Sequence, residues 1–180
     1  LSLNSIIPKS IYETNSFLIK KQINSDISLI EYAAFFGSIQ IFRYLQTNGV
    51  ELTPSLWIYA IHGKNAELIH FLEENNVKPE DVTYKECYKE AIKCHHNDIA
   101  MYIKDNLLQV KEEDLDDFFI QSLKHYNFAF INISNINKDS FYDLCHYDYY
   151  LFVKNLIKER SITLRILSII YSSKIQNQKF

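Results

Sequence analysis

The sequence predicts an all-α protein, a helical solenoid of four to five stacked helix-turn-helix units. Three observations support this prediction. The 180 residues include only three glycines and three prolines, about 3% together against roughly 12% in average proteins, so the frequent turns of sandwiches and barrels are missing. Hydrophobic residues make up 47% of the chain and aromatic residues 14%, which is enough to bury a core. The third observation is an internal repeat.

The repeat is clearest between residues 28–50 and residues 55–77, which align from end to end without a gap. Identical residues recur at Tyr32/Tyr59, Ala33/Ala60, Leu45/Leu72, Asn48/Asn75 and Val50/Val77. The same columns return, at a slightly longer interval, at Ala91, Ile92 and Ile103, and then at Ser122, Leu123 and Phe130. A fifth repeat is placed, after a shorter interval, at Leu144, Cys145 and Phe152.

Each repeat is expected to contain two short helices. The first half has small and apolar residues at helical spacing, as at Ile30, Ala33 and Ala34. Polar breaks follow at residues 36–38, 63–65, 95–97 and 126–127, and the second half again has apolar residues at helical spacing. Neither helix can bury its apolar face alone, so neighbouring pairs are expected to stack. Leu72 and Trp57 lie in apolar columns of the alignment and are predicted to be buried.

Residues 28–160 therefore form the expected repeat stack. Residues 1–27, with Ile11, Leu18 and Ile19 in a helical rhythm, are interpreted as an N-terminal helical cap or a degenerate repeat, because end repeats need an atypical outer face. Residues 161–180 are interpreted as a truncated repeat or cap. The acidic residues 109–117 are expected to begin the first helix of the fourth repeat.

The unit resembles an ankyrin repeat. The run from Tyr32 to Gly37, followed by Ile41 to Leu45, matches the paired small residues, the glycine-centred turn and the apolar second helix of that pattern. Residues 28–107 are similar, more closely, to the ankyrin-like domain of unknown function expanded in parasitic protists. This resemblance implies a repeat scaffold with no known chemistry. Because the periods of 27 and 31 fall short of the usual 33, it also implies shortened hairpin loops.

Charge and composition exclude several classes of function. Nineteen basic and 22 acidic residues give a net charge of −3, so the chain has no positive field to hold a nucleic-acid backbone. The longest apolar stretch near the C-terminus, residues 162–171, is interrupted by Arg165 and is too short to span a membrane. Three cysteines, an odd number, are typical of a reducing compartment. We expect a cytoplasmic protein that is monomeric and has no cofactor.

Cys94-His95-His96, with Cys87 seven residues earlier, is the one cluster of soft metal ligands in the sequence. On a helix that separation corresponds to about 10.5 Å of rise, too far for both sulfurs to bind one tetrahedral ion. We therefore expect these residues to be structural and no metal site to form. Cys145-His146 does not indicate a nucleophile either, because catalytic partners converge in space rather than in sequence. The sequence predicts no enzyme.

The repeat register predicts the accessibility of the three thiols, all of which are expected to be reduced. Cys87 falls on an apolar column, and Cys145 aligns with Ala34, so both are expected to be buried and slow to react. Cys94 aligns with Gly63 beside the turn and is expected to be the most accessible.

The expected function is protein binding. In ankyrin-like stacks the first helices line the concave side, and their outward positions meet the partner. The corresponding positions here are Tyr32, Phe35, Phe36, Tyr59, His62, Glu90, Lys93, Gln121 and Lys124. The row changes from aromatic to charged, which suits an amphipathic peptide or helix from a protein partner. Two alternatives stay open: the aromatic residues pack against the N-terminal segment, or the chain is a structural spacer of a longer repeat array with no partner of its own.

Overall fold

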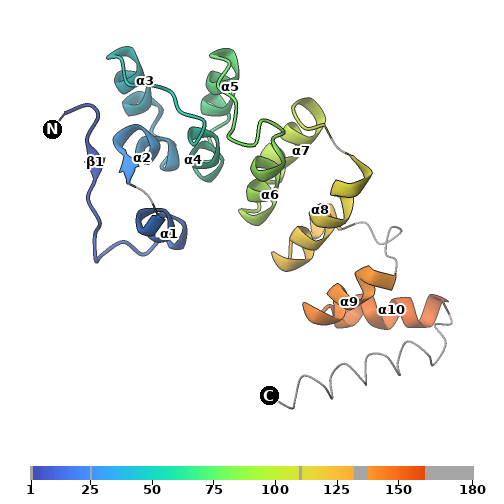
Figure 1. The fold of residues 1–180 in the computed structure, drawn as a ribbon. Coiled ribbons are helices and arrows are strands. Elements are labelled where there is room, and N and C mark those ends of the chain that lie inside the picture. The colour runs from blue at the N-terminus through green and yellow to red at the C-terminus, as the bar shows by residue number, and fades with distance from the viewer. Residues whose placement is uncertain (1, 25, 110, 132–137, 161–180) are drawn as a thin grey trace. The chain divides into compact units, whose positions relative to one another are not determined.

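The computed structural model describes residues 2–24, 26–109, 111–131 and 138–160, which form ten α-helices, one 3-10 turn and two short strands (Figure 1). The predicted all-α class is confirmed. No helix in these described ranges is both long enough and apolar enough to cross a membrane. The chain divides into two compact units, Leu1–Phe130 and Ile131–Phe180, called here the N-terminal unit and the C-terminal unit.

Within each helix pair of the N-terminal unit, the first helix ends and the second begins at a predicted polar break. Its elements are β1 (Ile6–Ile7), α1 (Ser16–Asn24), β2 (Ile27–Ser28), α2 (Leu29–Phe35), α3 (Ile39–Thr47), α4 (Leu56–His62), α5 (Ala66–Glu74), α6 (Lys85–Lys93), α7 (Asn97–Asn106), α8 (Glu112–Lys124) and the 3-10 turn η1 (Phe128–Phe130). The acidic run does begin α8, as predicted. The loops between helix pairs cover residues 48–55, 75–84 and 107–111.

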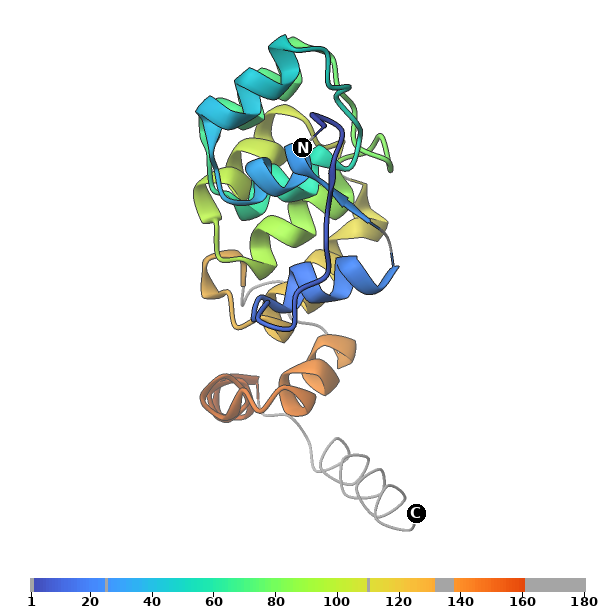
Figure 2. The same cartoon turned by 90° about the vertical axis from the view of Figure 1, so that its left-hand side faces the viewer.

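The N-terminal unit contains two rows of helices. Contacts run from α2 to α4, from α4 to α6 and from α6 to α8, so these four helices form a first-helix row. Each of α3, α5 and α7 packs against the helix that precedes it in the chain. Figure 1 shows the pairs side by side, and Figure 2, turned by 90°, shows successive pairs one behind another. Contacts therefore link mainly neighbouring pairs.

The turn between the two halves of each of the five repeats holds a residue with positive φ, and four of these five turns form without glycine. Gly37, Lys64, His95, Tyr126 and Asp148 all have positive φ, between 47° and 62°. The N–H of each donates to the carbonyl oxygen three residues earlier. A left-handed residue at this place ends the first helix and redirects the chain into the second. Each of the four non-glycine residues carries a conformational cost of roughly 1–2 kcal/mol.

The core of the N-terminal unit follows the repeat register. The left-handed residues recur at the intervals of the sequence alignment, one in each repeat, so the predicted spacing is confirmed. Leu45, Leu72 and Ile103, at equivalent places in their second helices, are at most 2% exposed. Trp57 is fully buried, and its indole N–H donates to the carbonyl oxygen of Val77 at 2.7 Å. The predicted core positions Leu72 and Trp57 are confirmed.

The segment that precedes α2 holds one helix and a strand pair rather than a continuous helical rhythm. Leu18 is buried within α1, as its spacing predicted, but Ile11 lies before that helix and is 91% exposed. Strand β1 pairs antiparallel with β2, with Ile6 opposite Ser28. Ser28 also caps α2 in a capping box with Glu31. The helical pattern was misleading at Ile11 because the side chains that pack onto the first helix pair lie in α1 and β2 instead.

The C-terminal unit contains one described helix pair, α9 (Lys138–His146) and α10 (Tyr150–Arg160), which contact each other. Leu144 is buried, but Cys145 is exposed, so the prediction that Cys145 is buried is wrong. Its equivalents Ala34 and Ile61 are buried in helices that pack beside the next first helix. The described residues contain no helix pair after α10 to cover Cys145. The predicted truncated repeat, residues 161–180, lies outside the described residues.

Candidate functional site

The nine predicted partner-binding residues all lie on or directly after the helices of the first-helix row, but their exposure differs. Phe35 and Tyr59 are buried, at 9% and 2% exposure. Tyr32, His62, Glu90 and Gln121 are half-buried, whereas Phe36, Lys93 and Lys124 are exposed. The row therefore has an aromatic half on α2 and α4, where the rings are mostly covered. It also has a charged half on α6 and α8, where side chains reach solvent.

Helix α1 covers the aromatic half of the row. The ring of Phe17 stacks on Phe35 with centroids 5.7 Å apart, meets the edge of Tyr59 at 5.4 Å and lies 3.9 Å from the ring of His62. The ammonium group of Lys21 lies over Phe17 and Tyr59, 5.6 and 5.9 Å from their centroids. For Phe35, packing against the N-terminal segment is thus the arrangement observed. An aromatic side chain packed in this way stabilises the fold and is covered from a partner by α1.

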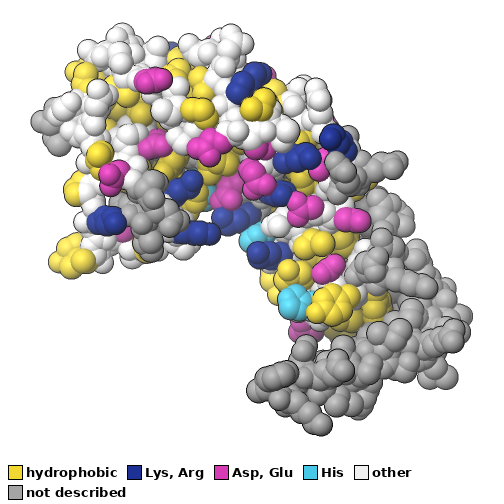
Figure 3. Space-filling model, viewed as in Figure 1, with side chains coloured by type: hydrophobic (Ala, Val, Ile, Leu, Met, Phe, Trp, Pro, Cys, Tyr) yellow, Lys and Arg dark blue, Asp and Glu magenta, His cyan; other side chains and the backbone are white. Residues whose placement is uncertain are grey.

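The charged half is tied together by ion pairs between α6 and α8. Lys85 pairs with Asp114 at 2.5 Å, and Lys89 pairs with Asp117 at 2.6 Å. Acidic and basic side chains are interleaved over these helices in Figure 3. At the end of α8, burial lowers the pKa of His125, and the positive charges of nearby lysines, Lys124 first, lower it further. Lys124 and Lys93 therefore place positive charge close to His125.

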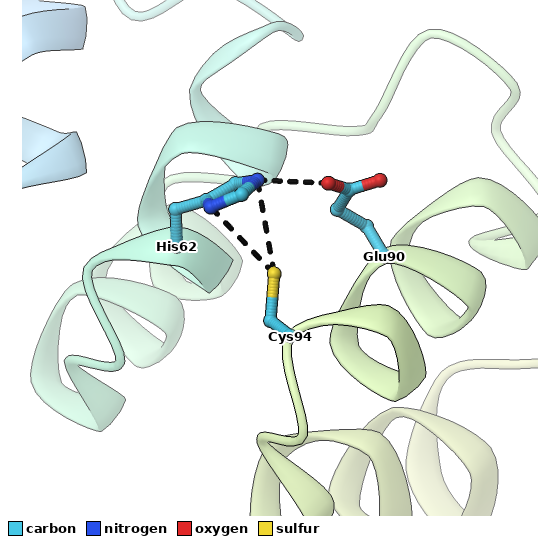
Figure 4. Close-up of side chains that lie close together, drawn as sticks. All are labelled: His62, Glu90 and Cys94. Atoms are coloured by element: carbon cyan, nitrogen blue, oxygen red, sulfur yellow. Dashed lines mark hydrogen bonds and ion pairs between the residues drawn. The ribbon is translucent and has the colours of Figure 1, made fainter. Parts of the chain in front are cut away.

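His62, Glu90 and Cys94 form a cluster between α4 and α6, called here the His62–Glu90–Cys94 cluster. Figure 4 shows the three side chains pointing toward one another, His62 from the end of α4 and the other two from the end of α6. Nε2 of His62 is 2.8 Å from Oε1 of Glu90. The sulfur of Cys94 lies 3.6 Å from Nδ1 and 3.8 Å from Nε2 of the same ring. All three are half-buried.

The electrostatics of the cluster keep Glu90 ionised and Cys94 protonated. Burial raises the pKa of Glu90, but hydrogen bonds from His62 and Lys93 outweigh it and hold the pKa at about 2. Burial raises the pKa of the Cys94 thiol to about 11, and the charge of Glu90 adds to this effect. An ionised carboxylate can only accept hydrogen bonds, so Nε2 of His62 is the nitrogen that carries a proton and donates to Glu90. The other ring nitrogen, Nδ1, is left to accept a hydrogen bond from the thiol of Cys94.

The histidines that follow Cys94 in the sequence turn away from it. Nε2 of His95 donates to the carbonyl oxygen of His125 at 2.8 Å, and Nδ1 of His96 donates to the carbonyl oxygen of Ile61 at 2.7 Å. Both act as structural links between successive helix pairs, as their place in the turn predicted.

The accessibility order predicted for the thiols is only partly correct. All three cysteines lie among the described residues, and none is in a disulfide. Cys87 is buried, and burial raises its pKa, so the prediction for this residue is confirmed. Cys94 is half-buried while Cys145 is exposed. The prediction that Cys94 is the most accessible thiol is therefore wrong, because His62 and α4 cover one side of Cys94.

Sequence reasoning missed the pairing of His62 with Cys94, which lie 32 residues apart. A usable signal was present in the register. His62 lies two positions before the left-handed Lys64, and Cys94 lies one position before the left-handed His95, so the two side chains end neighbouring first helices. Comparing the ends of successive first helices, rather than adjacent residues in the chain, would have brought them together.

Comparison with known proteins gives no match, whether with protein-family models, with curated proteins or with solved structures.

Proposed function

We propose that this protein is a non-catalytic, ankyrin-like helical repeat scaffold that binds a protein or peptide partner on its first-helix row. The proposal includes a monomeric chain that works in the cytoplasm. Its architectural support is the set of five left-handed turns at the predicted spacing and the unbroken contact from α2 through α4 and α6 to α8. A stack in which pairs contact mainly their neighbours offers a long row of outward positions for recognition.

The single observation that carries the proposal is the way α1 lies on the aromatic half of the row. This helix places one aromatic side chain, Phe17, among Phe35, Tyr59 and His62, next to its buried Leu18. An aromatic anchor set into a groove between helices is also the common way in which a partner helix is bound. The first-helix row therefore has the chemistry to hold a helical or extended segment along its length.

The charged half of the row is the part open to a partner. Lys93 and Lys124 are exposed at its rim, and the pKa of His125 is lowered partly by these two lysines. A segment with acidic residues would be attracted to the charges of these two exposed lysines, and an aromatic residue in it could pack against their apolar stems. We propose an acidic, amphipathic segment of another protein as the partner.

Selection of phage-displayed random peptides on the immobilised chain tests this function. Enriched peptides should be acidic, and fluorescence polarisation should show Lys93→Glu combined with Lys124→Glu weakening their binding by on the order of tenfold or more. Lys104→Glu, a charge reversal of the same kind at an exposed position of α7, is the matched control and should leave binding unchanged.

The alternative function is a structural spacer whose surfaces contact only neighbouring repeats of a longer array. Selection that enriches no peptide, or peptides that bind the double variant as well as the unaltered chain, would favour this alternative. Equal weakening by Lys104→Glu would show that net charge, rather than the first-helix row, governs binding.

A further inference from the structure

The His62–Glu90–Cys94 cluster presents nitrogen, oxygen and sulfur ligands to one point between two helices. Its three ligand atoms all lie within 4.8 Å of one another. Imidazole, carboxylate and thiolate are the three side-chain groups that bind Zn²⁺ in proteins. His62 and Glu90 also belong to the first-helix row, but the ligand atoms of the cluster face each other across the junction of α4 and α6 (Figure 4).

The distances in the cluster are close to those that a tetrahedral ion requires. Zinc bonds of about 2.0–2.3 Å imply separations of roughly 3.3–3.8 Å between neighbouring ligand atoms. The sulfur of Cys94 already lies 3.8 Å from Nε2 of His62. The carboxylate oxygen of Glu90, at 2.8 Å from Nε2, would have to retreat by about half an ångström, which rotation of a glutamate side chain allows.

The backbone and the aromatic neighbours hold two of the ligands in place. The ring of His62 packs against both Phe17 and Phe35, with centroids at 3.9 and 5.3 Å. Cys94 is the C-cap of α6, and its N–H donates to the carbonyl oxygens of Glu90 and Ile92. Ligands that need little rearrangement lose little conformational freedom when a metal binds.

We propose that His62, Glu90 and Cys94 bind a Zn²⁺ ion that links α4 to α6. The thiol proton of Cys94 passes to solvent as the sulfur–zinc bond forms, because a thiol that coordinates a metal is deprotonated. The His62 ring changes tautomer in the same step: Nε2 releases its proton to solvent and binds the ion, and Nδ1, which no longer accepts from the thiol, takes up a proton from solvent. Three protein ligands leave the fourth position of the ion for water. The ammonium group of Lys93, now 2.6 Å from Oε1 of Glu90, is displaced by the ion and extends into solvent.

An activated nucleophile is the competing interpretation, since the sulfur faces Nδ1 of His62 while Glu90 holds Nε2. Two features oppose it. The pKa of the Cys94 thiol is raised to about 11, and reactive cysteines have lowered values. Cys94 also lies at the C-terminal end of α6, where the helix dipole disfavours an anion. A metal ion removes both obstacles because its own charge stabilises the thiolate.

Titration of the reduced, chelator-treated chain with Co²⁺ and Zn²⁺ tests the site. One equivalent of Co²⁺ should produce a thiolate-to-cobalt charge-transfer absorption, and Zn²⁺ should abolish it by displacing the cobalt. Cys94→Ala should lose the absorption, and His62→Gln and Glu90→Gln should weaken binding at least tenfold. Cys145→Ala and His70→Gln, the latter removing a second histidine near a glutamate, are matched controls and should bind as the unaltered chain does.

A second measurement needs no variant. Alkylation by iodoacetamide, followed cysteine by cysteine with mass spectrometry, should become slower at Cys94 when Zn²⁺ is added and stay unchanged at exposed Cys145 of the same molecule. Absence of the cobalt absorption in the unaltered chain overturns the proposal, as does its retention in Cys94→Ala. Labelling of Cys94 that is fast and indifferent to Zn²⁺ also overturns it and favours the nucleophile.

Discussion

The junction between α2 and α4 and the junction between α4 and α6 use the same repeat position in opposite ways. That position, one residue before the left-handed turn residue, is Gly63 at the first junction and Cys94 at the second. A Cβ added to Gly63 would lie 2.3 Å from the carbonyl oxygen of Ala34 and 3.0 Å from the N–H nitrogen of Gly37. Cys94 instead directs a sulfur at His62.

The difference shows how one turn geometry supports two kinds of contact. At the first junction backbone lies against backbone, so no side chain fits at position 63, and the aromatic rings of this half pack against Phe17 of α1 instead. At the second junction a side chain fits, and polar groups of Cys94 and Glu90 enter beside His62. The two junctions therefore differ because Cys94, unlike Gly63, carries a side chain that reaches the neighbouring first helix.

The largest expected effect tests what the two junctions have in common. Leu72 is fully buried in α5, at the same place in its helix as Leu45 and Ile103. Leu72→Ala should reduce the free energy of unfolding by about 2–5 kcal/mol through lost burial and a residual cavity. Urea denaturation followed by circular dichroism measures this, with exposed Ile41→Ala as control. A loss for Leu72→Ala as small as that of the control would mean that the core does not run through both junctions.

A feature of the fold or of the candidate site could be predicted from the sequence when it depends on residues close together in the chain. The turn spacing and the burial of Leu72 and Trp57 were predictable because they depend on local periodicity. The exposure of Cys145 was not, because burial at that position depends on the helix pair that follows. His62 and Cys94 lie in neighbouring repeats, so no pattern within a single repeat indicates that they pair. Likewise, nothing local indicates that Phe17 covers Phe35.

The next effect tests the close approach at the first junction. Gly63→Ala should destabilise the protein by about 1–3 kcal/mol, because the new methyl group forces α2 and α4 apart against backbone atoms that cannot yield easily. Cys94→Ala at the equivalent position should cost less than about 1 kcal/mol, since it adds no atom to a junction that already holds a side chain. Thermal unfolding of both variants checks the order, and equal losses would contradict the contrast between the junctions.

A smaller effect is expected when the cover over the aromatic half is loosened. Phe17 is half-buried among Phe35, Tyr59 and His62, so Phe17→Ala should cost roughly 1 kcal/mol of stability. Amide hydrogen exchange should accelerate in α1 and at the end of α4, while α6 and α8 keep their protection. Ile19→Ala, on the exposed side of the same helix, is the control. Unchanged exchange in α1 after Phe17→Ala would show that another contact holds this helix.

The smallest effect concerns the lysine charges around His125, at the end of the charged half. Burial, followed by the charges of Lys124 and Lys93, lowers the pKa of His125 below its ordinary value of 6.5, while the charge of Glu90 opposes the shift and that of His95 adds to it. A folded-state pKa below the unfolded one means that the stability contributed by His125 is complete above the ordinary value. This contribution is lost as the pH falls toward the folded value, because the unfolded chain then binds the proton more readily.

Lys124→Gln removes the charge with the largest effect on His125, so the pKa of His125 should rise toward its ordinary value. NMR titration of the imidazole measures this change. Added salt should produce a shift in the same direction, because the lysines near His125 are exposed and easily screened. Lys104→Gln on α7 removes an equal charge from the second helix of its pair and should leave the titration of His125 unchanged. If the titration midpoint of His125 is the same in Lys124→Gln as in the unaltered chain, the charge of Lys124 does not contribute to the shift. The electrostatic distinction between the two halves of the first-helix row would then fail.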